Sequence, residues 1–300
     1  MTNTLIDTVQ LNFDTDAQWV LNVVLAFVMF GIALEISVND FKAVLRTPKA
    51  ILAGVCSQFL LLPIVTFLLV LIIHPTPSMA LGMFLVAACP GGNVSNFITH
   101  FAKGNTALSV SLTAVATLFS VVMTPLNLQL WGSSYAPTAD ILNTISVSPY
   151  DMVKLVALLL GLPLLLGMLI HNKFPNTARQ MAKFFKTASL VFFIVLVFLA
   201  LYNNRDIFMQ YVFCVFWLVL AHNILAFTTG FSIAKLFGLS KKDTRSITIE
   251  TGIQNSGLGL ILVLTFFDGL GGMALITAFW GILHLVSGLL LAGFWSKKPV

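Results

Sequence analysis

Charged residues are scarce in this chain. Asp, Glu, Lys and Arg account for 9% of its 300 residues, whereas 58% are hydrophobic, and the mean hydropathy is +0.97. An ordinary soluble domain is about one quarter charged, because its surface must face water. The composition therefore excludes a soluble globular protein and indicates an all-α polytopic membrane protein.

Cysteine is also rare. The three cysteines, Cys56, Cys89 and Cys214, all lie in apolar stretches, and none belongs to a CxxC pair. The histidines of the apolar stretches show no HExxH or other metal-binding spacing. Disulfide frameworks and structural metal sites need paired or closely spaced ligands. We therefore expect neither a disulfide nor a cofactor.

A basic N-terminal region is missing as well. Residues 1–18 carry Asp7, Asp14 and Asp16 but no Lys or Arg. A cleavable signal peptide needs a positively charged start. The sequence therefore predicts an external N-terminal segment over 1–18, followed by a first span that acts as its own insertion signal.

Nine apolar stretches are long enough to cross a bilayer as helices. If the N-terminus lies outside, 14 of the 16 Lys and Arg fall in inner loops or in a cytoplasmic tail over 296–300, and only Lys154 and Arg205 fall outside. This positive-inside bias supports an odd number of spans in the plasma or inner membrane. The predicted spans are 19–37, 48–73, 78–101, 106–130, 149–171, 184–202, 208–237, 244–267 and 271–295.

The net charge of +5 fits this topology and an attraction to anionic lipid of the inner leaflet. No face combines clustered basic and aromatic residues, so a nucleic-acid partner is not expected. No sequence feature points to a required protein partner either. Membrane lipid, an ion and a small solute are the expected partners.

Two short polar segments interrupt otherwise apolar spans. They read Cys-Pro-Gly-Gly-Asn-Val-Ser-Asn over 89–96 and Glu-Thr-Gly-Ile-Gln-Asn-Ser-Gly over 250–257. Proline and glycine end a helix, so each segment predicts two half-helices that meet in mid-membrane. The N-terminus of a half-helix attracts an anion, and free carbonyls attract a cation. Paired interruptions of this kind indicate the substrate and ion site of a secondary transporter.

The spacing of the two interruptions predicts an inverted repeat. Each broken span is the penultimate one of its half, the halves being spans one to four and five to nine. Five spans separate the two interruptions, and an odd separation makes the broken spans run in opposite directions through the membrane. Both half-helix N-termini are then expected to face one central cavity.

Glu250 is the most informative single residue. Apart from Asp151 at the very start of the span 149–171, only Glu35 and Glu250 place a carboxylate within a predicted span. An ionised side chain at the bilayer centre costs roughly 2.5 to 3.5 kcal/mol, and no Lys or Arg lies at a comparable depth. A bound cation is therefore favoured. Hard oxygen donors suited to Na⁺ occur nearby, namely Gln58, Ser95, Asn96, Gln254 and Asn255.

Other polar residues within the spans have weaker predictions. Ser109 and Thr113 share one face of the span after the first interruption, but such a pair more often makes ordinary interhelical hydrogen bonds. Glu35 lies near the cytoplasmic end of the first span and is expected to reach interfacial water. His284, in the last span, is a candidate for the cavity lining.

Several long motifs resemble the bile acid:sodium symporter family. They are CPGGNVSN with the following KGN turn and LSVSLTAVATL helix, then IETGIQNSGLGL, and the last-span sequence His-Leu-Val-Ser-Gly. The similarity extends from Val28 through the last span. It implies coupling of Na⁺ entry to uptake of an organic anion by alternating access. It also implies a core domain with two crossed broken helices, here 48–130 and 207–295, and a moving panel domain, here 19–47 and 149–206.

The resemblance also implies two sodium sites and a substrate site. At the substrate site, Asn93 and Asn255 are expected to face the anion at the half-helix ends. The first sodium would be bound by Ser95, Asn96, Ser109, Thr113 and Glu250, the second by Gln58, Glu250, Thr251, Ile253 and Gln254, and the substrate by Asn93, Val94, Asn255, Ser256 and His284.

The sequence leaves the substrate open. The family often has Thr-Ala where this chain has Asn93-Val94, and Asn where this chain has Leu285. Its substrates run from bile acids to pyruvate-like 2-oxo acids and pantoate. We expect a small 2-oxo or hydroxy acid, because an oily ligand would leave buried carboxamides unpaired. A steroid bile acid, a sodium-binding channel or sensor, and an intramembrane protease are the alternatives.

Overall fold

The computed structural model describes residues 5–8, 18–37, 47–145, 150, 153–154, 157–203 and 205–299. All secondary-structure elements of these residues are helices, as predicted. Residues 9–17 of the predicted external segment and 38–46 of the predicted panel lie outside the described part.

The short helix α1 (Leu5–Thr8) packs near the beginning of α6 (Pro77–Ala88). The Ser78 amide at the start of α6 donates a hydrogen bond of 2.8 Å to Asp7 Oδ1. Asp7 thus satisfies one of the amides that a helix leaves unpaired at its N-terminus. Ile6 is fully buried beside it, so α1 is anchored to the bundle by one apolar and one polar contact.

A π-helical segment interrupts one of the long helices. Helix α4 (Pro48–Cys56) continues into the π-helical segment η2 (Ser57–Leu61) and then into α5 (Leu62–Ile73). Pro63 lacks an amide donor and its ring crowds the carbonyl one turn earlier, so the helix widens just before it. The wider turn carries Gln58, whose side chain is buried.

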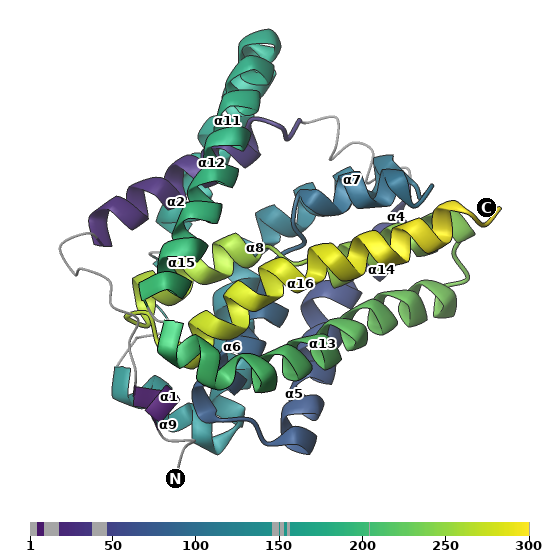
Figure 1. The fold of residues 1–300 in the computed structure, drawn as a ribbon. Coiled ribbons are helices and arrows are strands. Elements are labelled where there is room, and N and C mark those ends of the chain that lie inside the picture. The colour runs from purple at the N-terminus through teal and green to yellow at the C-terminus, as the bar shows by residue number, and fades with distance from the viewer. Residues whose placement is uncertain are drawn as a thin grey trace.

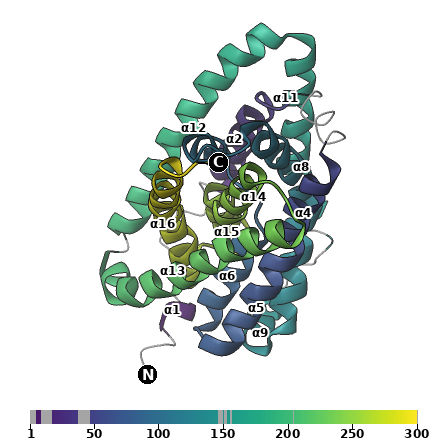
Figure 2. The ribbon, with the colours of Figure 1, turned by 90° about the vertical axis from the view of Figure 1, so that its right-hand side faces the viewer.

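Both predicted interruptions are present. Helix α6 ends at Ala88 and α7 (Val94–Phe101) follows, whereas α14 (Lys241–Gly252) ends before α15 (Ser256–Phe266) begins. Helix α6 is buried from Ser78 to Ala88. Figure 2 shows α14 and α15 near the centre of the molecule. Helices α6, α14 and α15 therefore form the interior of the bundle, whereas α7 exposes Phe97 and Phe101 on its outer face.

The two interruptions pair with each other through their backbones. The Gly92 amide donates to the Ile253 carbonyl at 2.9 Å, and the Asn255 amide donates to the Pro90 carbonyl at 2.8 Å. Gly91 and Gln254 form an antiparallel bridge between these bonds. Each extended segment thus satisfies backbone groups that hydrocarbon would leave unpaired. We call this paired region, 90–92 with 253–255, the crossover.

The remaining helices surround this centre in two groups. Helices α2, α11 and α12 pack against one another, whereas α13 packs against α5, α14 and α16 (Figure 1). Helix α8 packs against α4, α6, α7 and α14. The bounds are α2 (Gln18–Ala33), α8 (Thr106–Ser134), α9 (Ala136–Ile145), the π-helical segment η3 (Ala157–Gly161), α11 (Leu162–Lys173), α12 (Pro175–Asn203), α13 (Arg205–Leu236) and α16 (Gly271–Ser296).

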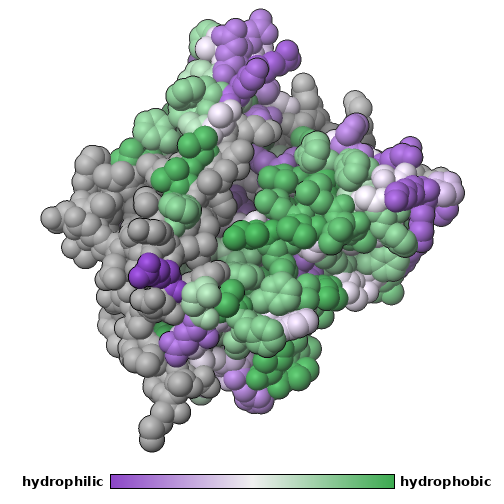
Figure 3. All heavy atoms as spheres, in the orientation of Figure 1, coloured by the Kyte–Doolittle hydropathy of each residue, from purple (hydrophilic) through white to green (hydrophobic). Residues whose placement is uncertain are grey.

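The outer surface is that of a multi-pass membrane protein. Four continuous helices in the described part are long and apolar enough to span a bilayer: Pro48–Ile73, Thr106–Ser134, Met209–Leu236 and Gly271–Ser296. Large apolar side chains such as Phe213, Phe231 and Leu290 are exposed on them. Figure 3 shows an apolar band over α13 and α16 with hydrophilic residues beyond its ends. The count of nine spans stays a prediction.

Candidate functional site

Glu250 is buried at the centre of a group of hydroxyl side chains. Its Oε2 accepts hydrogen bonds from Ser95 Oγ at 2.5 Å and Ser109 Oγ at 3.0 Å, and its Oε1 accepts one from Thr113 Oγ1 at 2.6 Å. All four side chains are at most 4% exposed. Hydrogen bonds to a charged group stabilise it by about 1.5 to 3 kcal/mol each. We call these four residues the carboxylate cluster.

The broken helices position this cluster. Ser95 lies in the first turn of α7, and Glu250 lies in the last turn of α14. Ser109 and Thr113 are one turn apart on α8, whose N-terminus is capped by the side chain of Asn105. A side chain at position 91 would collide with Glu250 Oε1. Glycine is therefore required there for the carboxylate to approach the crossover.

The cluster offers oxygen ligands around a single negative charge. Asn96 adds a carbonyl oxygen, because its Oδ1 lies 3.2 Å from Thr113 Oγ1. Within the described residues no group of three or more His, Cys, Asp or Glu is placed to hold a metal ion. An oxygen set of this kind, mostly neutral, suits a hard monovalent cation better than a transition metal. The structure thus brings together all five residues predicted for the first sodium.

Of the residues predicted for the second sodium, Glu250 belongs to the carboxylate cluster, and Ile253 and Gln254 lie in the crossover itself. Gln58 Nε2 donates to the Cys89 carbonyl and to Gln254 Oε1, both at 2.8 Å. Gln58 Oε1 is buried and has no hydrogen-bond partner among the described residues. A buried acceptor without a donor is costly unless something compensates for it. A cation beside Gln58 would compensate for it.

The carbonyl groups predicted for this site already accept one hydrogen bond each. The Thr251 carbonyl accepts from Gln254 Nε2 at 2.8 Å, and the Ile253 carbonyl accepts from the Gly92 amide at 2.9 Å. A carbonyl oxygen has two lone pairs, so each can still coordinate a cation. The donor set of the second site is compatible with the predicted ion.

Polar residues that the sequence reasoning missed support the second broken helix. Asn223 is fully buried in α13, and its Nδ2 donates to the Gly252 carbonyl at 2.9 Å. Ser287 Oγ on α16 donates to Asn223 Oδ1 at 2.5 Å. Ser57 Oγ lies 2.9 Å from Thr251 Oγ1. The sequence did contain a signal for Asn223, because this residue places a carboxamide next to His222 in the middle of the predicted span 208–237.

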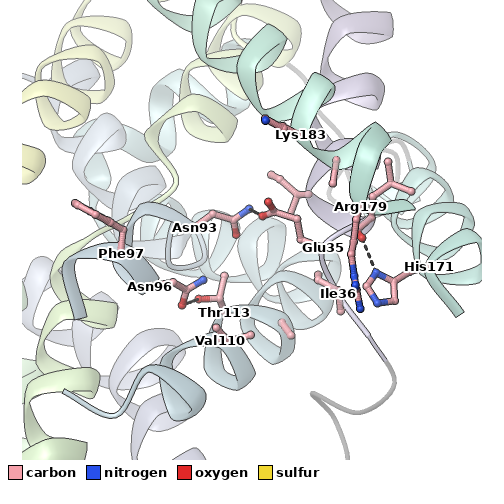
Figure 4. A pocket seen from close by; sticks show the side chains of 14 residues that line it. Glu35, Ile36, Asn93, Asn96, Phe97, Val110, Thr113, His171, Arg179 and Lys183 are labelled. Carbon is pink, nitrogen blue, oxygen red and sulfur yellow. Dashed lines mark hydrogen bonds between the residues drawn. The ribbon is translucent and has the colours of Figure 1, made fainter. Parts of the chain in front are cut away.

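A cavity of about 600 Å³ lies beside the carboxylate cluster. Its walls come from the end of α2, from α7 and α8, and from α11 and α12 (Figure 4). Seven of the fourteen lining residues are polar or charged, a high proportion for a ligand pocket. We call it the polar cavity; its polar lining residues are Glu35, Asn93, Asn96, Thr113, His171, Arg179 and Lys183.

Asn93 is the predicted substrate residue that lines the polar cavity. Its Nδ2 donates to Glu35 Oε2 at 3.4 Å, and the two side chains point toward each other in Figure 4. Arg179 and Lys183 reach the cavity from α12. The sequence reasoning assigned both cations to an inner loop and Glu35 to interfacial water. The positive-inside bias already explained the two cations, and access to interfacial water explained Glu35. Their role in a cavity was therefore missed.

The other predicted substrate residues do not line the polar cavity. Val94 is exposed at the start of α7, and Ser256 and His284 are buried. Asn255 is the N-cap of α15, where its Oδ1 accepts from the Leu258 amide at 3.0 Å. Asn255 thus lies at the half-helix end as predicted, but part of its hydrogen-bonding capacity serves the helix.

Comparisons with known proteins agree with this architecture. The model of the Sodium Bile acid symporter family matches residues 22–211. A sodium-dependent transporter of Bacillus subtilis is 33% identical over 93% of this chain and 83% of its own length. A probable chloroplastic sodium/metabolite cotransporter of Arabidopsis thaliana is 31% identical over 91% of this chain and 66% of its own. The human ileal sodium/bile acid cotransporter is 27% identical over 83% and 70%, respectively.

Proposed function

The chain belongs to the sodium bile acid symporter family and is a sodium-dependent transporter rather than an enzyme, and on this basis we propose that it imports a small organic carboxylate together with Na⁺. The observation that carries the proposal is the carboxylate cluster, a single buried carboxylate surrounded by neutral oxygens at the crossing of two broken helices. A channel or sensor would not need to link an ion site to a substrate cavity in this way.

In this proposal the first Na⁺ occupies the space where the hydroxyl hydrogens face Glu250, and the hydroxyl groups keep their protons. The hydroxyl groups of Ser95, Ser109 and Thr113 rotate so that their lone pairs face the ion, while Asn96 and Glu250 contribute carbonyl and carboxylate oxygens. In the same proposal a second Na⁺ is bound by Gln58, Glu250, Gln254 and the carbonyls of Thr251 and Ile253. Its positive charge compensates for the buried Gln58 Oε1.

Helix α7 couples the ions to the substrate. Ser95 donates to Glu250 in the carboxylate cluster, whereas Asn93, two residues earlier, lines the polar cavity. Na⁺ binding would fix the first turn of α7 and thereby the carboxamide that meets the substrate carboxylate. Such a shared element makes the binding of ion and substrate positively cooperative, with a favourable coupling free energy of typically about 1 to 3 kcal/mol in magnitude.

The lining of the polar cavity favours a small 2-oxo or hydroxy acid, such as pantoate or a pyruvate-like acid. Arg179 and Lys183 supply positive charge, and the N-terminus of α7 supplies partly positive amides. The volume of about 600 Å³ and the exposed Phe97 favour a bile acid as the second candidate. Each polar lining group that a steroid left unpaired would cost about 1 to 3 kcal/mol.

Alternating access would move the group α2, α11 and α12 against the rest of the bundle. The polar cavity lies between this group and α7 and α8, so a relative movement would open and close it. With the predicted external N-terminus, the cavity faces the cytoplasm and the conformation is inward-facing. The two oppositely directed broken helices would then present a corresponding opening outside in the other conformation.

Uptake is expected to be electrogenic for a monocarboxylate. Two Na⁺ and one monoanion together move one net positive charge inward, and an inside-negative potential adds roughly 2.3 kcal/mol per 100 mV to the driving force. In proteoliposomes, an inward Na⁺ gradient should drive accumulation, and a potassium diffusion potential should accelerate it. Accumulation that shows neither current nor potential dependence would contradict this stoichiometry, and equal uptake in K⁺ would contradict symport.

Asn255 does not line the polar cavity, so its replacement tests whether the bound acid extends from that cavity to the N-terminus of α15. In that case substrate binding should weaken, without a change in the sodium affinity measured in the absence of substrate. Asn255→Leu removes the carboxamide but also the cap of α15, which is worth about 1 kcal/mol. Asn255→Ser retains an oxygen that can cap the helix and is the cleaner variant. We expect it to reduce affinity for the acid about tenfold or more, as for one hydrogen bond to an anion. If calorimetry shows that Asn255→Ser binds the acid as tightly as the wild type does, Asn255 only caps α15 and does not bind the substrate.

A further inference from the structure

Glu35 introduces a negative charge into a cavity that should bind an anion. It follows the end of α2, faces the polar cavity and lies 3.4 Å from the Asn93 amide nitrogen. His171 Nδ1 lies 2.6 Å from the carbonyl of the preceding residue, Leu34. The Glu35 amide also donates to the Ile32 carbonyl at 3.0 Å. The backbone that carries this carboxylate is therefore held in place.

The cavity attracts an anion in spite of Glu35. Arg179 and Lys183 are four residues apart, so they share one face of α12, and both line the cavity. Among Arg179, Lys183 and Glu35, two positive charges face one negative charge. The lining therefore keeps a net charge of about +1 by formal counting. An anionic substrate is attracted by this balance, and Glu35 can only add selectivity among anions.

The chemistry of a carboxylate indicates what it selects. An ionised carboxylate accepts hydrogen bonds at about four positions and donates none. A 2-oxo group also only accepts, whereas a 2-hydroxyl both donates and accepts. Both groups are attached to the carbon next to the substrate carboxylate. If that carboxylate meets the Asn93 amide, the neighbouring group falls next to Glu35, which lies beside the same amide.

We propose that Glu35 is a specificity-determining residue that accepts a hydrogen bond from the substrate hydroxyl, so that the transporter prefers 2-hydroxy acids to the matching 2-oxo acids. This inference rests on the proposed function, because it takes the polar cavity as the carboxylate site. A 2-oxo acid would place two acceptors against each other with no proton between them. Sites that hydrogen-bond a hydroxyl reject analogues lacking it far more strongly than apolar pockets reject an extra methylene.

Matched acid pairs test the preference. The probes are lactate against pyruvate and pantoate against its 2-oxo analogue, each titrated into the purified full-length protein in saturating Na⁺. We expect the wild type to bind each hydroxy acid at least tenfold more tightly than its oxo partner. In Glu35→Gln the carboxamide can donate as well as accept, so the ratio should fall to within about threefold. Glu35→Asp, which keeps the acceptor, should restore part of the ratio.

Lys183→Met provides the comparison for a general charge effect. It removes one positive charge from the same cavity, so it should weaken both members of a pair to a similar extent and leave their ratio unchanged. If Glu35 only neutralised the α12 cations, Glu35→Gln would strengthen both acids equally. That result, or a wild-type ratio near one, would overturn the inference while leaving the proposed function intact. Failure of every acid to bind in Na⁺ would overturn both.

Discussion

Replacing Glu250 by alanine is expected to abolish sodium-driven uptake while leaving the protein folded and inserted. The substitution removes the only charge shared by the two proposed ion sites, and three hydroxyl groups lose their acceptor. Losing about 3 kcal/mol of ion binding lowers sodium affinity by roughly 100-fold. Insertion should not suffer, because a buried charge is removed from the membrane interior. Radiolabelled uptake into proteoliposomes measures the loss.

Glu250→Gln is the matched control for folding. Its side-chain oxygen can still accept from a hydroxyl, and its volume fills the same space, but it carries no charge. We expect it to be as well folded as the wild type by size-exclusion chromatography and equally deficient in sodium-driven uptake. A folded Glu250→Gln protein with normal sodium dependence would remove Glu250 from the centre of the mechanism.

Adding one methyl group at Gly91 is expected to cause the second-largest loss. The Cβ atom of Gly91→Ala would overlap Glu250 Oε1 and come close to the rest of that side chain, so the carboxylate must move away from the crossover. Overpacking costs about 1 to 3 kcal/mol of folding free energy, and displacing the carboxylate relieves it. A displaced carboxylate contacts the ion less closely, so we expect sodium affinity to fall roughly tenfold to hundredfold. The measurement is the sodium concentration that gives half-maximal uptake.

Gly293→Ala controls for the addition of a methyl group to a membrane glycine. A Cβ atom at Gly293 in α16 would meet no atom within 4 Å, and alanine is a better helix former than glycine. We expect unchanged uptake and equal or higher stability. Similar losses in Gly91→Ala and Gly293→Ala would show that the close approach at Glu250 is not the cause.

The positions of the interruptions and the importance of Glu250 could be predicted from sequence because they break strong local rules. Glycine, proline and carboxamides in a hydrocarbon span require compensation, and a lone carboxylate there needs a partner. The first interruption was expected within 89–96, and α7 begins inside this range at Val94. Physical reasoning alone indicated a cation near Glu250, whereas the grouping of Ser109 and Thr113 with it came from the family resemblance.

Other features depend on tertiary contacts that no local pattern encodes. The backbone pairing of Gly92 with Ile253 joins segments about 160 positions apart, and periodicity contains no information about it. Asn223 and Ser287 lie in predicted spans where polar residues usually serve interhelical contacts. Arg179 and Lys183 fit the positive-inside rule, so their second role was visible only in the structure, where α7 and α12 both line the polar cavity.

The most direct test of sodium binding at the crossover needs no substrate. Thermal unfolding of the purified wild type and of Glu250→Gln is followed while Na⁺ replaces K⁺ at constant ionic strength. Ligand linkage predicts stabilisation of the wild type by about 2.7 kcal/mol when Na⁺ reaches 100 times its dissociation constant, and no selective stabilisation of Glu250→Gln. A wild type whose unfolding temperature is the same in Na⁺ and K⁺ would contradict the account.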